Sequence, residues 1–305
     1  MKKNIFFKIF IVFFVVMYLV ENNYLFFKFS PSVTFTSLFG VALYLLAQIL
    51  KAFRLYSLYE LYEYSFIGFC KKYFQYNSLL ILLPFRLGDA YRIVFFKNYA
   101  SNFIMSFNIL LVERMTDLFF LILLMIMIMF HGAIIYKELL NSLLIILLLI
   151  FFLFYMLEHC LKLLQGFALR RSKSKFFPVF FKSIGLYGAS LIEIKTTINK
   201  KLMLLISTTV FIWIIEILGF VMVLGYFNNF EIQIVLLILF IMLSFVLPLG
   251  PVGFGGIQLA FFWYTQLTNS AIDNDFAISQ TYLIYISGLL IGLIIFAYEK
   301  IVKKK

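Results

Sequence analysis

The sequence predicts an all-α fold, a polytopic bundle of transmembrane helices. Hydrophobic residues make up 64% of its 305 positions and charged residues 13%, about half the charged share that is usual in soluble domains. Several apolar runs approach or exceed the roughly 20 residues that a helix needs to cross the hydrocarbon core. Because backbone polar groups must be bonded internally in lipid, we expect helices throughout, with about eight crossings.

The formal net charge of +12 does not indicate a nucleic-acid partner. Nucleic-acid-binding domains gather basic residues on one face of a soluble fold. Here these residues lie mostly between the apolar runs, a pattern that sets membrane orientation. The two cysteines and two histidines are too few for a disulfide framework or a metal site. We therefore expect no metal, no cofactor and no nucleic acid.

The first half of the chain contains four apolar runs. Residues 5–20 are interpreted as a retained first helix, because no small-residue cleavage site follows them. Residues 33–50 form the second run. The third run, 79–96, is interrupted by proline, glycine and charged residues, so we predict a broken or re-entrant segment. The fourth run, 103–130, would be about 42 Å long as a helix, which is enough to span.

The second half contains further apolar runs at 139–157, 202–226, 232–247, 254–267 and 277–298. The 254–267 run is too short to cross unaided, so it is a second candidate for a broken segment. Because each half then has a segment with proline and glycine before a long span, an internal repeat is possible. Paired interrupted segments of this kind indicate the midplane site of a transporter.

Orientation follows from the basic residues, which concentrate in 1–8, 51–72, 159–201 and 300–305. Under the positive-inside rule both termini are cytoplasmic, in a bacterial-type inner membrane. The loops alternate between the two sides of the membrane in this topology only if 79–96 enters the membrane and returns to the cytoplasmic side.

We expect one integral membrane domain, 1–305. It consists of a first half (1–158), a basic interfacial loop (159–201) and a second half (202–305). The loop mixes basic residues with apolar clusters, which is typical of helices lying in the membrane interface. Ordinary positive-inside bias with packing against the spans is the alternative.

The first polar motif is PFRLGDAYR, within the third run. It contains Pro84, Arg86, Gly88, Asp89 and Arg92. The proline removes a backbone donor and the glycine allows a bend, so both are structural-bend residues. The charged residues alternate in sign at steps of three, which makes them neighbours on a helix.

The second motif is LLVERMTDLFF, near the middle of the fourth run. Charges at a helix centre cost at least about 2.5 kcal/mol each on insertion scales. Arg114 lies three residues before Asp117 and can pair with it, which leaves Glu113 without a local partner. One interpretation is a buried ion-pair network that holds the broken segment to the long helix. The other is that an arginine leaves its carboxylate to grip the phosphate of a head group. Glu216, deep in a later run, is a candidate proton carrier or a partner for an arginine.

The third motif is VLPLGPVGFGGIQ. It is no nucleotide P-loop, because no Gly-Lys-Ser/Thr follows. We predict an unwound bend whose backbone N–H groups line an anion site, although a tight turn between helices is the alternative. The bend residues are Pro248 and Pro251, and the lining residues are Gly253, Gly255, Gly256 and Gln258.

With these motifs the chain resembles the lysylphosphatidylglycerol synthase transmembrane-region family of flippase-like membrane proteins. The family pattern is P-x-R-x-G-E followed by Arg, then E-R-x-x-D, then a late P-x-x-x-G-G-x-G stretch that ends in an acidic residue. This chain departs from it at Asp89, where the family has Glu, and at Gln258, where the family usually has an acidic side chain. Family enzymes that transfer lysine carry a further soluble domain, so aminoacyl transfer is not expected here.

The resemblance implies binding or translocation of an amphipathic lipid that bears phosphate, such as a phospholipid or a lipid-linked sugar. No catalytic residue is assigned. The substrate-binding residues would be Arg86, Asp89, Arg92, Glu113, Arg114, Asp117, Gly253, Gly255, Gly256 and Gln258. Two alternatives remain: a membrane-embedded transferase that uses a polyprenyl-phosphate donor, with Asp89 or Glu113 as general base, and a non-catalytic assembly partner of a cell-envelope enzyme.

Overall fold

The computed structural model describes about two thirds of the chain in separate stretches. The described residues are 33–59, 65–82, 87–96, 99, 103–131, 145, 148–149, 178–226, 232–244, 257–258, 260–261, 264–265 and 274–302.

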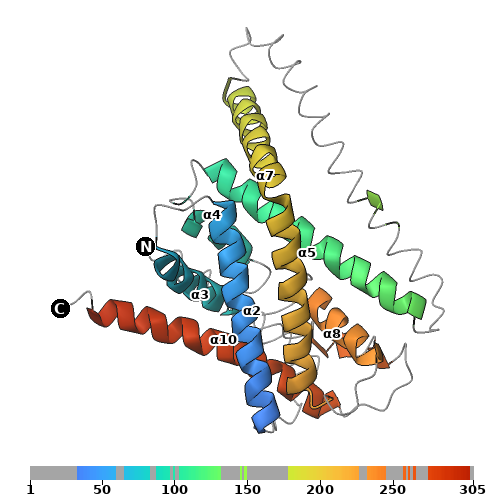
Figure 1. The fold of residues 1–305 in the computed structure, drawn as a ribbon. Helices are drawn as coiled ribbons and strands as arrows, with labels where there is room; N and C mark the ends of the chain where they lie inside the picture. The colour runs from blue at the N-terminus through green and yellow to red at the C-terminus, as the bar shows by residue number, and fades with distance from the viewer. Residues whose placement is uncertain are drawn as a thin grey trace, which may run out of the picture. The chain divides into compact units, whose positions relative to one another are not determined.

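Within these residues nearly all positions are helical and none is in a strand, which confirms the predicted fold class. The helices, labelled in Figure 1, are α2 (Phe35–Leu58), α3 (Phe66–Leu82), α4 (Leu87–Phe96), α5 (Phe103–His131), α7 (Pro178–Val223), α8 (Ile232–Ser244) and α10 (Asn274–Val302).

Three of the described helical segments are long and apolar enough to cross a membrane: Phe35–Leu58, Lys200–Val223 and Phe276–Glu299. They match the predicted runs 33–50, 202–226 and 277–298. Helix α5 is also long, but it carries three charged residues near its middle. The first run, 5–20, and most of 139–157 lie outside the described residues, so the prediction of about eight crossings is not tested.

Two helix boundaries differ from the sequence prediction. Helix α3 ends at Leu82 and α4 begins at Leu87, and residues 83–86, which contain the proline of the predicted break, lie outside the described residues. Helix α3 begins at Phe66, however, inside a segment that the sequence analysis assigned to a basic flank. Helix α7 begins at Pro178 and continues through the predicted interfacial loop into the span. The sequence analysis expected interfacial helices there, and the segment is helical from residue 178 on, but it continues into the span without a boundary.

The chain divides into two compact units. Unit 1 contains Met1–Leu45, Asn77–Gly88 and Ile217–Lys305, and unit 2 contains Leu46–Tyr76 and Asp89–Glu216. Helices α2, α3, α4 and α7 each contribute residues to both units.

In unit 1 the backbones of α2 and α7 approach closely at two glycines. A Cβ atom added to Gly40 would lie 2.6 Å from the carbonyl oxygen of Gly219, and one added to Gly219 would lie 2.9 Å from the carbonyl oxygen of Gly40. Next to this crossing, the rings of Tyr44, Phe220 and Tyr285 contact one another. Small residues that let helices approach are the usual solution where lipid offers no hydrophobic driving force.

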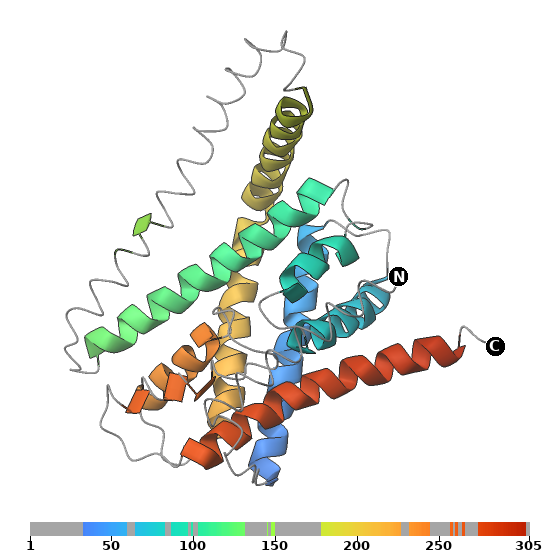
Figure 2. The same cartoon turned by 180° about the vertical axis from the view of Figure 1, so that it is seen from behind.

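In unit 2, α3 and α4 pack against α2 through aromatic side chains, and Figure 2 shows these helices from behind. Phe69 of α3 contacts Tyr56 of α2 and Phe96 of α4. Phe96 also contacts Tyr76, the last α3 residue that belongs to unit 2. These ring contacts hold the short helix α4 in place although it has only 10 residues.

Candidate functional site

The candidate site of unit 2 begins with two carboxylates on α5. Glu113 and Asp117 are four residues apart, so they project from one face of the helix. Glu113 is buried, and the side chain of Asp117 is 22% exposed. Thr116, between them, donates to the carbonyl oxygen of Val112 and so satisfies its hydroxyl within the helix. Apolar turns of α5 precede and follow these carboxylates, so they lie near the middle of the helix.

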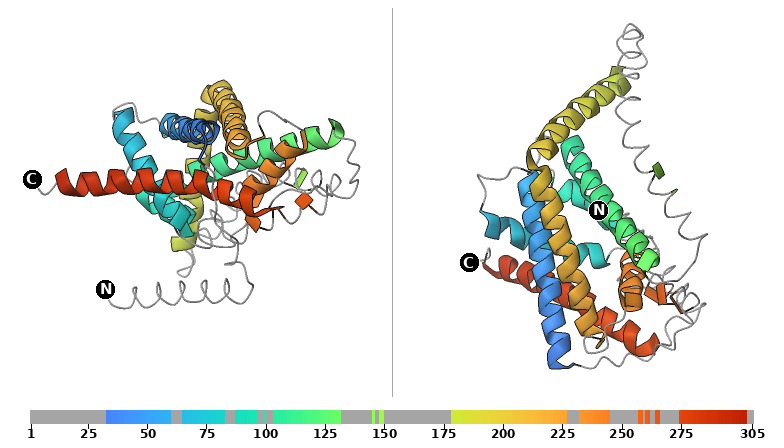
Figure 3. Two further views of the ribbon diagram at one scale, coloured as in Figure 1. Left: turned by 90° about the horizontal axis from the view of Figure 1, so that it is seen from below. Right: turned by 45° about the vertical axis from the view of Figure 1, so that its right-hand side comes forward.

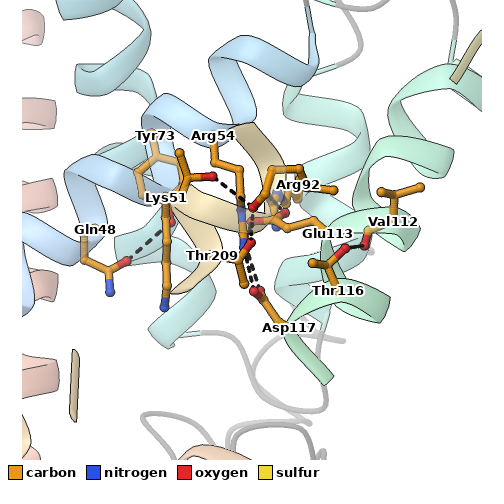
Figure 4. Close-up of polar contacts among 12 residues, drawn as sticks. Gln48, Lys51, Arg54, Tyr73, Arg92, Val112, Glu113, Thr116, Asp117 and Thr209 are labelled. Carbon is orange, nitrogen blue, oxygen red and sulfur yellow. Dashed lines mark hydrogen bonds and ion pairs between the residues drawn. The ribbon is translucent and has the colours of Figure 1, made fainter. Parts of the chain in front are cut away.

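Arg54 of α2 bridges the two carboxylates and is the centre of the site (Figure 4). Its Nη1 and Nη2 atoms donate to the two oxygens of Asp117 at 2.7 Å and 3.0 Å, a bidentate pairing. Nη2 also donates to Oε1 of Glu113 at 3.2 Å, and Nη1 donates to Oγ1 of Thr209 on α7 at 3.0 Å. The Arg54 side chain has no exposed surface.

Arg92 of α4 completes the group by donating to the other oxygen of Glu113, Oε2. Its guanidinium carbon lies 5.3 Å from the centre of the Tyr76 ring, within cation–π distance. Both oxygens of Glu113 therefore accept from an arginine, one from α2 and one from α4.

We call Arg54, Arg92, Glu113 and Asp117 the buried charge cluster. Its two positive and two negative charges sum to zero, and they come from three helices. A buried ion pair often stabilises less than apolar side chains of similar volume, while removal of one partner is strongly destabilising. The cluster therefore joins α2, α4 and α5. It does so at the cost of removing four charges from water, a cost that apolar packing does not carry.

A second ion pair lies one helical turn away along α2. Nζ of Lys51 donates to Oε1 of Glu216 on α7 at 2.5 Å. The same oxygen accepts from Nε2 of Gln48 at 3.3 Å, and the amide oxygen of Gln48 accepts from the hydroxyl of Tyr73 at 3.3 Å. Gln48 and Lys51 lie on the same helix as Arg54, as Figure 4 shows. We call Lys51 and Glu216 the outer pair.

The second half of α7 runs beside α2 in the opposite direction (Figures 1 and 3). From Lys51 to Ser57 the partners on α7 run backwards, from Glu216 to Thr209 to Lys201. Nζ of Lys201 donates to the carbonyl oxygen of Ser57 at 2.6 Å, in the last turn of α2. A cation at this position satisfies a carbonyl group that the helix leaves unbonded.

Three of the predicted site residues come together in the structure: Arg92, Glu113 and Asp117. Asp117 has a partner that the sequence analysis did not expect, because Arg54 of α2 binds both of its carboxylate oxygens. Glu113, expected to lack a local partner, has two arginine partners from other helices. The sequence argument considered an ion-pair network between the broken segment and the long helix, but not the guanidinium that α2 supplies.

The remaining predicted residues are only partly described. Gly88 and Asp89 lie on α4, and nothing is described of their side chains; Arg114 lies on α5 and is partly exposed. Gln258 is helical, and its Nε2 atom donates to the hydroxyl of Tyr282 at 3.2 Å within unit 1. Seven predicted residues lie outside the described part of the chain: Pro84, Arg86, Pro248, Pro251, Gly253, Gly255 and Gly256.

The sequence analysis missed Lys51 and Arg54, which it counted only as basic residues flanking a span. A signal was present. Gln48, Lys51 and Arg54 recur at steps of three, which places polar groups along one side of an apolar helix. Such a stripe inside a membrane helix faces protein rather than lipid.

Metal chemistry has no evident ligand set here: in the stretches that the structure describes, no three His, Cys, Asp or Glu side chains come together.

One protein family matches this chain. The family model of the lysylphosphatidylglycerol synthase TM region matches residues 5–295, nearly the whole chain. The chain belongs to this family. Membership makes it a membrane protein related to lipid handling and confirms the resemblance carried by the motifs. No curated protein and no solved structure is significantly similar to it.

Proposed function

We propose that this protein binds a phosphate-bearing lipid, a phospholipid or a lipid-linked sugar, and moves its head group across the inner membrane. The observation that carries the proposal is the buried charge cluster, which joins α2, α4 and α5 inside an apolar helical protein. Family membership supports the lipid as substrate.

The physical argument concerns the barrier that a head group meets. Moving a charged group through hydrocarbon costs several kcal/mol or more, because nothing there replaces its water. A cluster of paired charges between helices offers partners that water would otherwise supply. Arginine suits this task, because its planar fork binds two phosphate oxygens at once.

Two arginine nitrogens in the cluster support an additional acceptor. The Nε atoms of Arg54 and Arg92 are buried, and neither has a hydrogen-bond partner within the described part of the chain. Leaving a buried donor unbonded costs about 1–3 kcal/mol. Native proteins retain such donors mainly where function or a bound group requires them.

The transferase alternative has less support. A general base needs an oxygen within reach of the substrate proton, but both oxygens of Glu113 are engaged by arginines, and the side chain is buried.

The proposal also places both termini in the cytoplasm and uses no nucleotide, so movement would be passive or driven by a gradient.

The proposal is tested with purified protein in liposomes that contain labelled phosphatidylglycerol or labelled polyprenyl phosphate. A reagent that cannot cross the membrane quenches the outer label, and the remaining fluorescence reports movement. We expect wild type to accelerate movement of at least one of these lipids and Glu113→Gln to abolish it. Wild-type protein that moves neither lipid would contradict the proposal and favour a transferase or an assembly partner.

A further inference from the structure

The outer pair contains a cation that is more exposed than the arginines of the buried charge cluster. This inference rests on the proposed function and assigns the first phosphate contact. Three cations of this site have ion pairs that the structure describes: Lys51, Arg54 and Arg92. They differ in how many of the described bonds each would have to break and in how much surface each exposes.

Arg54 is the least able to leave. Its side chain has no exposed surface, and it makes four hydrogen bonds to Glu113, Asp117 and Thr209. Its departure would remove the guanidinium from both carboxylates at once. Uncompensated buried charge is among the costliest defects in a fold.

Arg92 is nearly as constrained. Its side chain is 4% exposed, it donates to Glu113, and its guanidinium lies over the Tyr76 ring. Release would require the guanidinium to give up both contacts without access to water.

Lys51 differs from both arginines in its exposure and in its contacts. Its side chain is 22% exposed, and its single hydrogen bond goes to Glu216. When Lys51 leaves, Glu216 keeps the bond from Gln48, whose amide is itself anchored by Tyr73. The carboxylate therefore retains a fixed resting position. An ammonium group on a flexible four-carbon stem can also turn towards a new acceptor without losing its charge.

We propose that Lys51 receives the phosphate of the lipid head group, and that Glu216 is the counter-ion that holds this lysine when the site is empty. Lys51 lies three residues before Arg54, about one helical turn along α2. A phosphate held by Lys51 therefore reaches the edge of the buried charge cluster.

The test measures binding of fluorescent short-chain phosphatidylglycerol to the purified full-length protein in detergent, by anisotropy. Lys51→Met should weaken binding roughly tenfold or more, because a charge-assisted hydrogen bond is lost. Glu216→Gln should tighten binding severalfold, because Lys51 no longer has a competing carboxylate. Lys200→Met, which removes an exposed lysine of α7, should leave binding unchanged.

The double variant Lys51→Met/Glu216→Gln separates this role from a structural one. If Lys51 binds the phosphate, the double variant binds as weakly as Lys51→Met, because the counter-ion has nothing left to hold. If the outer pair only stabilises the fold, Glu216→Gln weakens binding too, and the double variant recovers wild-type affinity. Thermal unfolding of each variant accompanies the titration, so a loss of folded protein is not mistaken for weak binding.

The outcomes distinguish failure of this inference from failure of the proposed function. Translocation by wild type with no change of affinity in either single variant would overturn the role of Lys51 alone. Wild-type protein that neither moves nor binds the anionic lipid would overturn both. Labelled diacylglycerol, which lacks phosphate, should show no dependence on Lys51. Displacement of the lipid by an equal concentration of sodium phosphate would overturn the lipid as the source of the phosphate.

Discussion

At the scale of single residues, Arg54 is the side chain on which the site depends. It contacts two carboxylates and a threonine, whereas Arg92 contacts Glu113 alone among the carboxylates of the cluster. When Arg92 is lost, Glu113 still has Arg54. When Arg54 is lost, the described structure leaves Asp117 without the guanidinium that now binds both its oxygens.

This difference predicts unequal effects of two matched variants. We expect Arg54→Met to lower the apparent Tm of the purified protein clearly more than Arg92→Met does. Removal of one partner of a buried pair costs about 3–5 kcal/mol, and the cost is smaller where a second cation remains. Thermal unfolding in detergent measures both. Equal losses, or a larger loss for Arg92→Met, would contradict the central place of Arg54.

Thr209 offers a finer test of the same site. Its hydroxyl donates to the carbonyl oxygen of Leu205 at 2.6 Å and accepts from Arg54 at 3.0 Å. Thr209→Val keeps the shape and leaves one Arg54 donor without this acceptor, so we expect a loss of about 1–3 kcal/mol. Thr208→Val is the control, because its hydroxyl bonds only to α7 carbonyl groups and is partly exposed. If both variants lower stability equally in unfolding experiments, the contact with Arg54 contributes nothing measurable.

At the scale of elements, the contact of α2 with α7 in unit 1 depends on the absence of side chains. An alanine at Gly40 would place its Cβ 2.6 Å from a backbone oxygen and 2.7 Å from a methyl group of Val223. Replacing glycine by alanine inside a helix normally stabilises it by about 1 kcal/mol. At this crossing the helices must separate instead, and packing contacts are lost.

Gly40→Ala is therefore expected to lower the apparent Tm, and Gly288→Ala to leave it unchanged or raise it. Gly288 is the matched position, since its nearest neighbour would be a side-chain carbon of Tyr44 at an ordinary 3.6 Å. Unfolding of the two purified variants is compared under identical conditions. A stable Gly40→Ala protein would show that the helices are not in close contact there.

The elements also show what the sequence could predict and what it could not. Apolar length predicted α2, α5 and α10, because crossing hydrocarbon imposes a minimum run that is visible in composition. Helix α3 escaped prediction, because its basic residues were interpreted as topology signals. Helices were expected in the basic loop, but not one continuous helix from the loop into the span. Charge patterning predicted that Glu113 and Asp117 share a face, but not that Arg54 joins them, since that contact depends on how two helices pack.

At the scale of the whole molecule, family membership and the buried charge cluster lead to the same functional proposal. A protein that only needed stability would fill this space with apolar side chains. The cluster is instead charge-balanced without any ligand, and a more exposed ion pair lies next to it. Under the proposed function, an arginine or lysine of such a site exchanges its carboxylate partner for a phosphate when the head group binds.

The most direct measurement is the rate of phosphatidylglycerol movement across liposomes that contain wild type, Glu113→Gln or Lys200→Met, each shown to be folded by thermal unfolding. The account predicts rapid movement with wild type and with Lys200→Met, and movement no faster than in protein-free liposomes with Glu113→Gln. Equal movement with all three proteins would contradict it, because the head group would then cross without the buried charge cluster.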